Sequence, residues 1–271
     1  MGAAVQGDWL AAQRALADRP PRAPRLPLWA GGHAIGTVEP DFINKIGLEP
    51  PSDGHSLLLY KEHSTKPGWH LQGDPTTALA TLAQAMRRAG LAGVWRDEPL
   101  AVTTPEGLRI GTVERAAVRP LGIATHAVHL VGAAPDGRVW VQQRALDKAN
   151  DPGLWDTLMG GMVSAADGLH GALVRETWEE AGLRIEALAQ LARQGRVTIR
   201  RPSPDGDGAG YMVEAIDWFS ATVPVPQVPV NQDGEVAQFA LLDRDELVRR
   251  LQQGMFTLEA SLILAAWLGC R

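Results

Sequence analysis

Cysteine is almost absent from this chain of 271 residues, since Cys270 is the only one. A single thiol excludes an intrachain disulfide and a zinc site built from cysteines. The longest apolar run, residues 260–268, is too short to span a bilayer. Residues 1–6 lack the basic and then apolar pattern of a secretory signal. These absences predict a cytoplasmic protein with no segment in the membrane.

Lysine is also scarce, because it occurs only at positions 45, 61, 66 and 148, and arginine supplies most of the positive charge. The formal net charge is −5. A negative balance gives no general attraction to nucleic acid or to an anionic membrane surface. We therefore expect a small-molecule partner, and neither a nucleic acid nor a membrane.

Length and patterning predict two modules. A chain of 271 residues can form one large domain or two small ones. Before residue 119, short strand-like segments, including 56–60 and 93–96, surround a helix at 74–89 that Asp74 can cap. After it, strand-like segments precede two helical segments near the C-terminus. We expect a small α+β region at 1–118 and a separate module at 119–271.

The most informative stretch is residues 160–183. Glu176, Glu179 and Glu180 are three and four positions apart, so a helix places them on one face. Like charges this close repel each other, whereas a hard divalent cation takes several carboxylate oxygens at once. The opposite face carries three apolar residues that we expect to be buried: Val174, Trp178 and Ala181. The spacing therefore predicts a divalent metal site on one face of a helix.

This stretch resembles the Nudix box, Gly-x5-Glu-x7-Arg-Glu-U-x-Glu-Glu-x-Gly-U, in which U is a bulky aliphatic residue. Seven positions match it in register: Gly161, Arg175, Glu176, Glu179, Glu180, Gly182 and Leu183. Asp167 replaces the first Glu, and Thr177 stands at an aliphatic position. The resemblance implies that residues 119–271 form an α/β/α sandwich around a mixed sheet. It also implies hydrolysis of a nucleoside diphosphate derivative or a similar organic diphosphate.

The resemblance assigns roles to individual box residues. It implies that the metal ligands for Mg²⁺ or Mn²⁺ are Glu176, Glu179 and Glu180, with the carbonyl of Gly160 as a further ligand. Arg175 is expected to orient these carboxylates and to pair with the acid at position 167. Such an ion neutralises the diphosphate and lowers the pKa of a bound water.

Further candidates lie outside the box. Glu235 stands where many Nudix enzymes place a later acid that binds metal or acts as a base, although an acid beside a turn fits equally well. Arg144 and Lys148 can grip phosphates, with ordinary surface cations as the alternative. The segment around Trp155 also occurs in isopentenyl diphosphate isomerases. Those enzymes use a cysteine, and the position of Cys270 near the C-terminus argues against that activity.

The order of the two modules is similar to that of a Nudix subgroup related to thiamine pyrophosphokinase. Val-Glu-Arg-Ala-Ala at 113–117 and the pair His126 and His129 carry this likeness. It implies thiamine diphosphate or its damaged analogues as substrate, and it predicts that residues 1–118 contribute to substrate choice. Nucleoside diphosphate sugars, dinucleotides and a non-catalytic sensor role are the alternatives. A homodimer is common in the family, and the sequence shows no oligomeric state.

Overall fold

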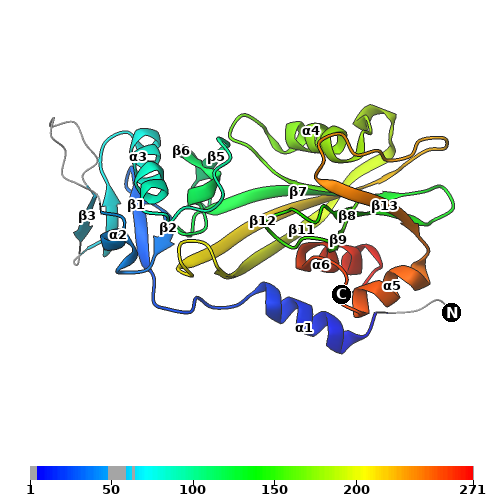
Figure 1. Cartoon of the computed structure of the whole chain (residues 1–271), viewed down its shortest axis with the longest axis horizontal. Coiled ribbons are helices and arrows are strands. Elements are labelled where there is room, and N and C mark those ends of the chain that lie inside the picture. The colour runs from blue at the N-terminus through cyan, green and yellow to red at the C-terminus, as the bar shows by residue number, and fades with distance from the viewer. Residues whose placement is uncertain (1–4, 48–58, 63–64, 271) are drawn as a thin grey trace.

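The computed structural model describes residues 5–47, 59–62 and 65–270. It is elongated, with a small region at one end and a larger sandwich at the other (Figure 1). The small region contains a four-stranded sheet in the order β2-β1-β4-β3. Its strands are β1 (Leu26–Ala30), β2 (His33–Val38), β3 (Leu59–Glu62) and β4 (Gly68–Leu71), and a short helix, α2 (Phe42–Lys45), follows β2. Residues 56–58 of the strand predicted at 56–60 lie outside the described residues.

The helix predicted at 74–89 is confirmed as α3 (Pro75–Arg88). Asp74 caps it by accepting a hydrogen bond from the Thr77 amide at 2.9 Å, as the sequence predicts. Leu79, Leu82 and Met86 are fully buried in the core of the small region. Two further strands, β5 (Pro99–Thr103) and β6 (Arg109–Glu114), form an antiparallel pair and lead into the short 3₁₀ helix η1 (Arg115–Ala117).

The strand predicted at 93–96 is wrong. The Gly93 amide donates to the Ala116 carbonyl at 2.8 Å, and the Arg96 amide donates to a Glu114 carboxylate oxygen at 3.0 Å. These amides bond to a turn and to a side chain, so the segment joins no sheet. Apolar alternation alone did not reveal these local partners.

The sandwich is built around a seven-stranded sheet in the order β11-β12-β7-β8-β13, with β10 paired to β7 and β9 paired to β8. The strands are β7 (Ala124–Ala133), β8 (Val139–Arg144), β9 (Trp155–Asp156), β10 (Met159–Met162), β11 (Ala189–Ser203), β12 (Gly210–Thr222) and β13 (Val236–Leu242). β12 runs parallel to β7, whereas β11 pairs antiparallel with β12. The predicted mixed sheet is therefore confirmed.

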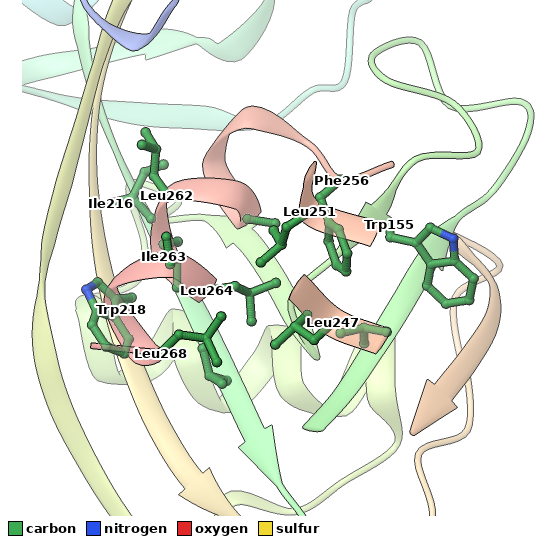
Figure 2. Packing of buried hydrophobic residues seen from close by; sticks show 14 of the residues in the cluster. Trp155, Ile216, Trp218, Leu247, Leu251, Phe256, Leu262, Ile263, Leu264 and Leu268 are labelled. Carbon is green, nitrogen blue, oxygen red and sulfur yellow. The ribbon is translucent and has the colours of Figure 1, made fainter. Parts of the chain in front are cut away.

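Helices cover both faces of this sheet, which confirms the α/β/α sandwich. Figure 1 shows α4 (Leu169–Ala181) on one side, and α5 (Arg244–Gln252) and α6 (Leu258–Trp267) on the other. Successive side chains of β7 point to opposite faces of the sheet. Val128 packs in the core cluster with α4, and Ala127 packs in the core cluster with α6. In Figure 2, α6 covers Ile216 and Trp218 of β12.

Helix α4 buries Ala181 as predicted, and Val174 packs against the same core cluster, but Trp178 is exposed. Trp178 is 44% exposed, and the Arg184 guanidinium lies 5.0 Å from its ring centre. Thr177 is fully buried instead, since its hydroxyl donates to the Leu173 carbonyl at 2.6 Å. A hydroxyl bonded within the helix costs little to bury, so the helix can turn this side toward the sheet.

Helix α1 (Gly7–Ala17) packs on the sandwich and not on the small region that follows it. Its residues Leu10 and Ala17 belong to the same core cluster as α6. The Arg19 amide then donates to the Arg200 carbonyl at 2.8 Å. The first region therefore reaches across both halves of the molecule, and the division at residue 119 stays a prediction. None of the described helices is long and apolar enough to cross a membrane.

Candidate active site

Two glycines bring the box loop close to its helix. Strand β10 holds Gly160 and Gly161, and α4 follows it along the chain. A Cβ at Gly161 would overlap the carboxyl group of Glu176, and one at Gly160 would overlap the ring of His129. Only glycine allows this approach of backbone to side chain.

Glu180 is the most deeply buried acid of the box, at 2% exposure. It accepts hydrogen bonds from the Gly160 amide at 3.0 Å and from Gln142 Nε2 at 2.8 Å. Burial raises the pKa of Glu180 to about 8, although both hydrogen bonds act in the opposite direction. The positive charge of Lys148 also lowers this pKa, but it does not offset the effect of burial.

The other two box glutamates share Arg175. One guanidinium nitrogen, Nη1, donates to Glu176 and to Glu179, both at 2.9 Å. Arg175 Nε donates to Asp167 at 3.0 Å, so the expected contact between these two residues is present. Burial raises the pKa of Glu176 to about 7 even though Arg175 lowers it. Arg175 thus fixes the orientation of three carboxylates at once.

The carboxylates of the box suit a divalent ion, but only two of the three border the cavity in which an ion could bind. Among the described residues, no three Asp, Glu, His or Cys side chains are arranged to hold a metal ion. Glu176 and Glu180 border one cavity, whereas Glu179 does not. Two carboxylates suit Mg²⁺, which takes its other ligands from water and substrate phosphates. Binding by Glu179 and by the Gly160 carbonyl stays a prediction.

The cavity has a volume of about 370 Å³. It brings together six residues that the sequence singled out: Glu176, Glu180, Gly160, Arg144, Lys148 and Glu235. Pairing of β8 with β13, in which Arg144 lies opposite Val236, brings Arg144 close to Glu235, and Lys148 forms an ion pair with Glu235. A polyanion entering this cavity therefore meets cations on one wall and box carboxylates on another.

The two upstream cations already have partners. Lys148 Nζ forms an ion pair with Glu235, and this pair leaves the pKa of Glu235 below its usual value although burial raises it. Arg144 donates to the Asn150 carbonyl at 3.1 Å and lies 3.7 Å from Asp156. Both cations border the cavity, so phosphate oxygens can replace or join these partners.

Two residues that border the cavity, His129 and Glu214, were given no role in the site by the sequence reasoning. His129 Nδ1 lies 3.0 Å from the Thr157 hydroxyl and 3.5 Å from Asp156. Glu214 stands on β12 on the same face as Ile216, at a position where alternation predicts an apolar residue. An acid that interrupts such an apolar face is the signal that would have identified it.

The small region also borders the site. A second cavity, of about 530 Å³, adjoins the first and shares Arg115, Arg119 and Asn150 with it. Its wall includes residues of the segment that precedes β5, among them Val94 and Arg96. Residues before position 119 therefore form part of the space that a ligand would occupy.

Comparison with known proteins identifies relatives of this chain. The family model for the NUDIX domain matches residues 124–262. Nudix hydrolase 20, chloroplastic, of Arabidopsis thaliana is 28% identical over 200 residues, which cover 72% of this chain and 52% of that protein. An isopentenyl-diphosphate Delta-isomerase of Streptomyces avermitilis is 30% identical over 160 residues, which cover 58% of this chain and 77% of the isomerase.

The crystal structure of DR0079 from Deinococcus radiodurans has a TM-score of 0.49 at 18% identity and covers 62% of this chain and 98% of that one. The chain spans about half the length of the Arabidopsis protein and of a second curated relative. The family match covers more than half of the chain, including the box and the sheet that carries it. The chain belongs to the NUDIX domain family.

Proposed function

We propose that this chain is a divalent-metal-dependent hydrolase that cleaves the phosphoanhydride bond of an organic diphosphate. One observation carries the proposal. Glu176 and Glu180, two carboxylates with little solvent, border the same cavity as the cations Arg144 and Lys148. A diphosphate needs both kinds of group, because the carboxylates hold a metal and the cations face phosphate oxygens. Membership of the NUDIX family supports this reading.

The residues divide the chemistry between them. A bound Mg²⁺ or Mn²⁺ would neutralise the diphosphate and lower the pKa of an attacking water. Arg175 keeps Glu176 oriented, and the amide of Gly160 keeps Glu180 oriented. Glu235 is the candidate base because it borders the same cavity, but its ion pair with Lys148 lowers its pKa and makes it a weak proton acceptor while the pair persists. If Lys148 turned from Glu235 to a substrate phosphate, Glu235 would be free to accept the proton.

The finer substrate proposal is thiamine diphosphate or a damaged analogue, converted to the monophosphate and phosphate. It rests on the likeness of residues 113–117 and of the two-module order to that subgroup. Nucleoside diphosphate sugars and dinucleotides are the alternatives within the same chemistry. The second cavity supports a contribution of the small region to this choice, because Arg96 and Val94 form part of its wall.

The relatives named as isomerases do not change the proposal. Among the described residues, no cysteine borders the first cavity. Cys270 lies just after α6, where its amide donates to the Ala265 carbonyl at 3.0 Å and its side chain packs on the core. A sensor that merely binds a ligand is the remaining alternative, and it gives no reason for the box carboxylates.

A panel of diphosphates incubated with Mg²⁺ or Mn²⁺ tests the proposal. Phosphate and monophosphate products are measured for wild type, for Glu180→Gln and for Glu186→Gln, an exposed acid outside the cavity. We expect Glu180→Gln to lose nearly all activity with its fold intact, and Glu186→Gln to match wild type. Full activity of Glu180→Gln would refute the assignment, and no turnover of any diphosphate by wild type would favour the sensor.

A further inference from the structure

Glu214 occupies an unusual place on the sheet. It lies on β12 on the same face as Ile216 and Trp218, which α6 covers (Figure 2). α6 begins at Leu258, and Glu259 in its first turn borders the cavity together with Glu214. Glu214 therefore interrupts the apolar face of β12 between Met212 and Ile216, and it borders the cavity.

Glu214 has very little to compensate its burial. It is 7% exposed, and its hydrogen bond comes from the Thr125 hydroxyl at 3.4 Å. That hydroxyl lies equally far from the Val213 carbonyl, and its one proton cannot serve both. Within the described part of the chain, Glu214 forms no ion pair. A buried carboxyl group with so weak a partner costs stability.

The nearby arginines do not supply the missing partner. Arg115 binds Glu98 at 2.7 Å, and Arg119 lies 3.4 Å from Asp205. Burial and the neighbouring Glu259 raise the pKa of Glu214, although Arg119 and Arg115 lower it. Among the described residues only the Thr125 hydroxyl hydrogen-bonds this carboxyl group, so a bound molecule can supply the missing partner.

Glu214 also stands apart from the proposed metal site. It projects from β12, whereas the box glutamates project from α4, the helix on the opposite face of the sheet. The charged groups that act on Glu180 are Glu176 and Lys148, and those that act on Glu214 are Glu259, Arg119 and Arg115. A diphosphate held at the box would therefore direct its organic group, and not its phosphates, toward Glu214.

We propose that Glu214, supported by Thr125, hydrogen-bonds the organic group of the substrate and selects diphosphates whose organic group is a heteroaromatic ring or a sugar over those with a hydrocarbon chain. The inference rests on the proposed hydrolase function. A site built to hydrogen-bond its substrate rejects an analogue that lacks the polar group by about 10⁴-fold, because its own buried group is then left unpaired. The wild-type chain should accordingly prefer polar diphosphates to isopentenyl diphosphate.

Three substrates and three variants test this selection. kcat and KM are measured with thiamine diphosphate, ADP-ribose and isopentenyl diphosphate for wild type, Glu214→Leu, Thr125→Val and the exposed control Glu186→Gln. For the better polar substrate, we expect Glu214→Leu to lower kcat/KM about 30-fold or more, mainly through KM, and Thr125→Val to lower it less. Turnover of isopentenyl diphosphate should stay equal or rise. Equal losses on all substrates, or no loss on any, would overturn the proposal.

Stability distinguishes recognition from a structural role. Replacing an uncompensated buried acid by leucine should leave Tm unchanged or raise it, whereas a structural acid would lower Tm. If Glu214→Leu does not fold, the structural role is favoured, and Glu214→Gln then decides by the same substrate comparison. Calorimetric binding separates this inference from the hydrolase proposal. Even if no diphosphate is hydrolysed, the role of Glu214 is supported when wild type binds a polar diphosphate more tightly than isopentenyl diphosphate and Glu214→Gln loses this preference. Equal binding of the two diphosphates by wild type refutes the role.

Discussion

Glu180→Gln should change stability with pH as well as abolish hydrolysis. Burial raises the pKa of Glu180 from 4.5 to about 8 in the metal-free protein. A raised folded-state pKa means that stability is fully present below the ordinary value and is lost as pH rises through about 8. Each pH unit in that window changes the free energy of unfolding by about 1.4 kcal/mol. Between pH 5 and pH 7, wild type should therefore lose about 3 kcal/mol from this residue.

The glutamine variant removes that loss, because its amide carries no charge at any of these pH values. It can still accept the hydrogen bond from the Gly160 amide. At about 2–4 °C per kcal/mol, its Tm should exceed that of wild type by several degrees near pH 7 and by little near pH 5. Glu176, whose pKa is raised to about 7, remains in both proteins, but its charge also raises the pKa of Glu180, so the difference between the two proteins includes the repulsion between these two acids.

Thermal unfolding of EDTA-treated protein from pH 5 to pH 8.5 measures this difference. Addition of Mn²⁺ should then raise the Tm of wild type more at pH 8 than at pH 6, because a carboxylate must lose its proton to bind metal. The variant should respond much less. Parallel Tm curves for the two metal-free proteins would show that Glu180 is not held in a desolvated site, and the argument from burial would fail.

Three further changes test other parts of the structure. Gly161→Ala should lower metal affinity and kcat/KM by about 10-fold or more, because the added Cβ would overlap the Glu176 carboxyl group. The control Gly7→Ala should have no such effect, because the space around Gly7 is open. Leu264→Ala should lower the free energy of unfolding in urea by about 2–5 kcal/mol with the site intact. Arg119→Gln should alter the ranking of diphosphates by KM while kcat changes little, and an unchanged ranking would contradict a role for that wall.

The sequence alone could predict the cluster of glutamates because the spacing of residues on a helix fixes which side chains share a face. Glu176, Glu179 and Glu180 do project from neighbouring positions of α4, as a repeat of three and four requires. The rule does not say how they compete for a nearby cation. Arg175 binds both Glu176 and Glu179, yet only Glu176 borders the cavity together with Glu180. Spacing thus predicts which residues lie close together on the helix, but not which of them face the cavity.

The errors have a common physical origin. Trp178 was predicted to be buried from its apolar character, but Thr177 takes the inner position because its hydroxyl finds a partner within the helix. The segment 93–96 was predicted as a strand, but its amides bond to Ala116 and Glu114. In each case a local hydrogen bond had more influence than the weak preference of the apolar residues for a buried position or a strand. The apolar pattern of the sequence does not reveal such a hydrogen bond.

The box by itself cannot choose a substrate. It consists of one strand, one loop and one helix, and its side chains would face the phosphates and the metal ion of the proposed reaction. The organic group must therefore be recognised by residues that other elements supply to the same cavity. Here those residues are Glu214 from β12 and the arginines at positions 115 and 119, which precede β7 and lie outside the family match. Two chains with the same box can consequently act on different diphosphates, and in this chain the difference should map to Glu214 and the wall formed by residues before position 124.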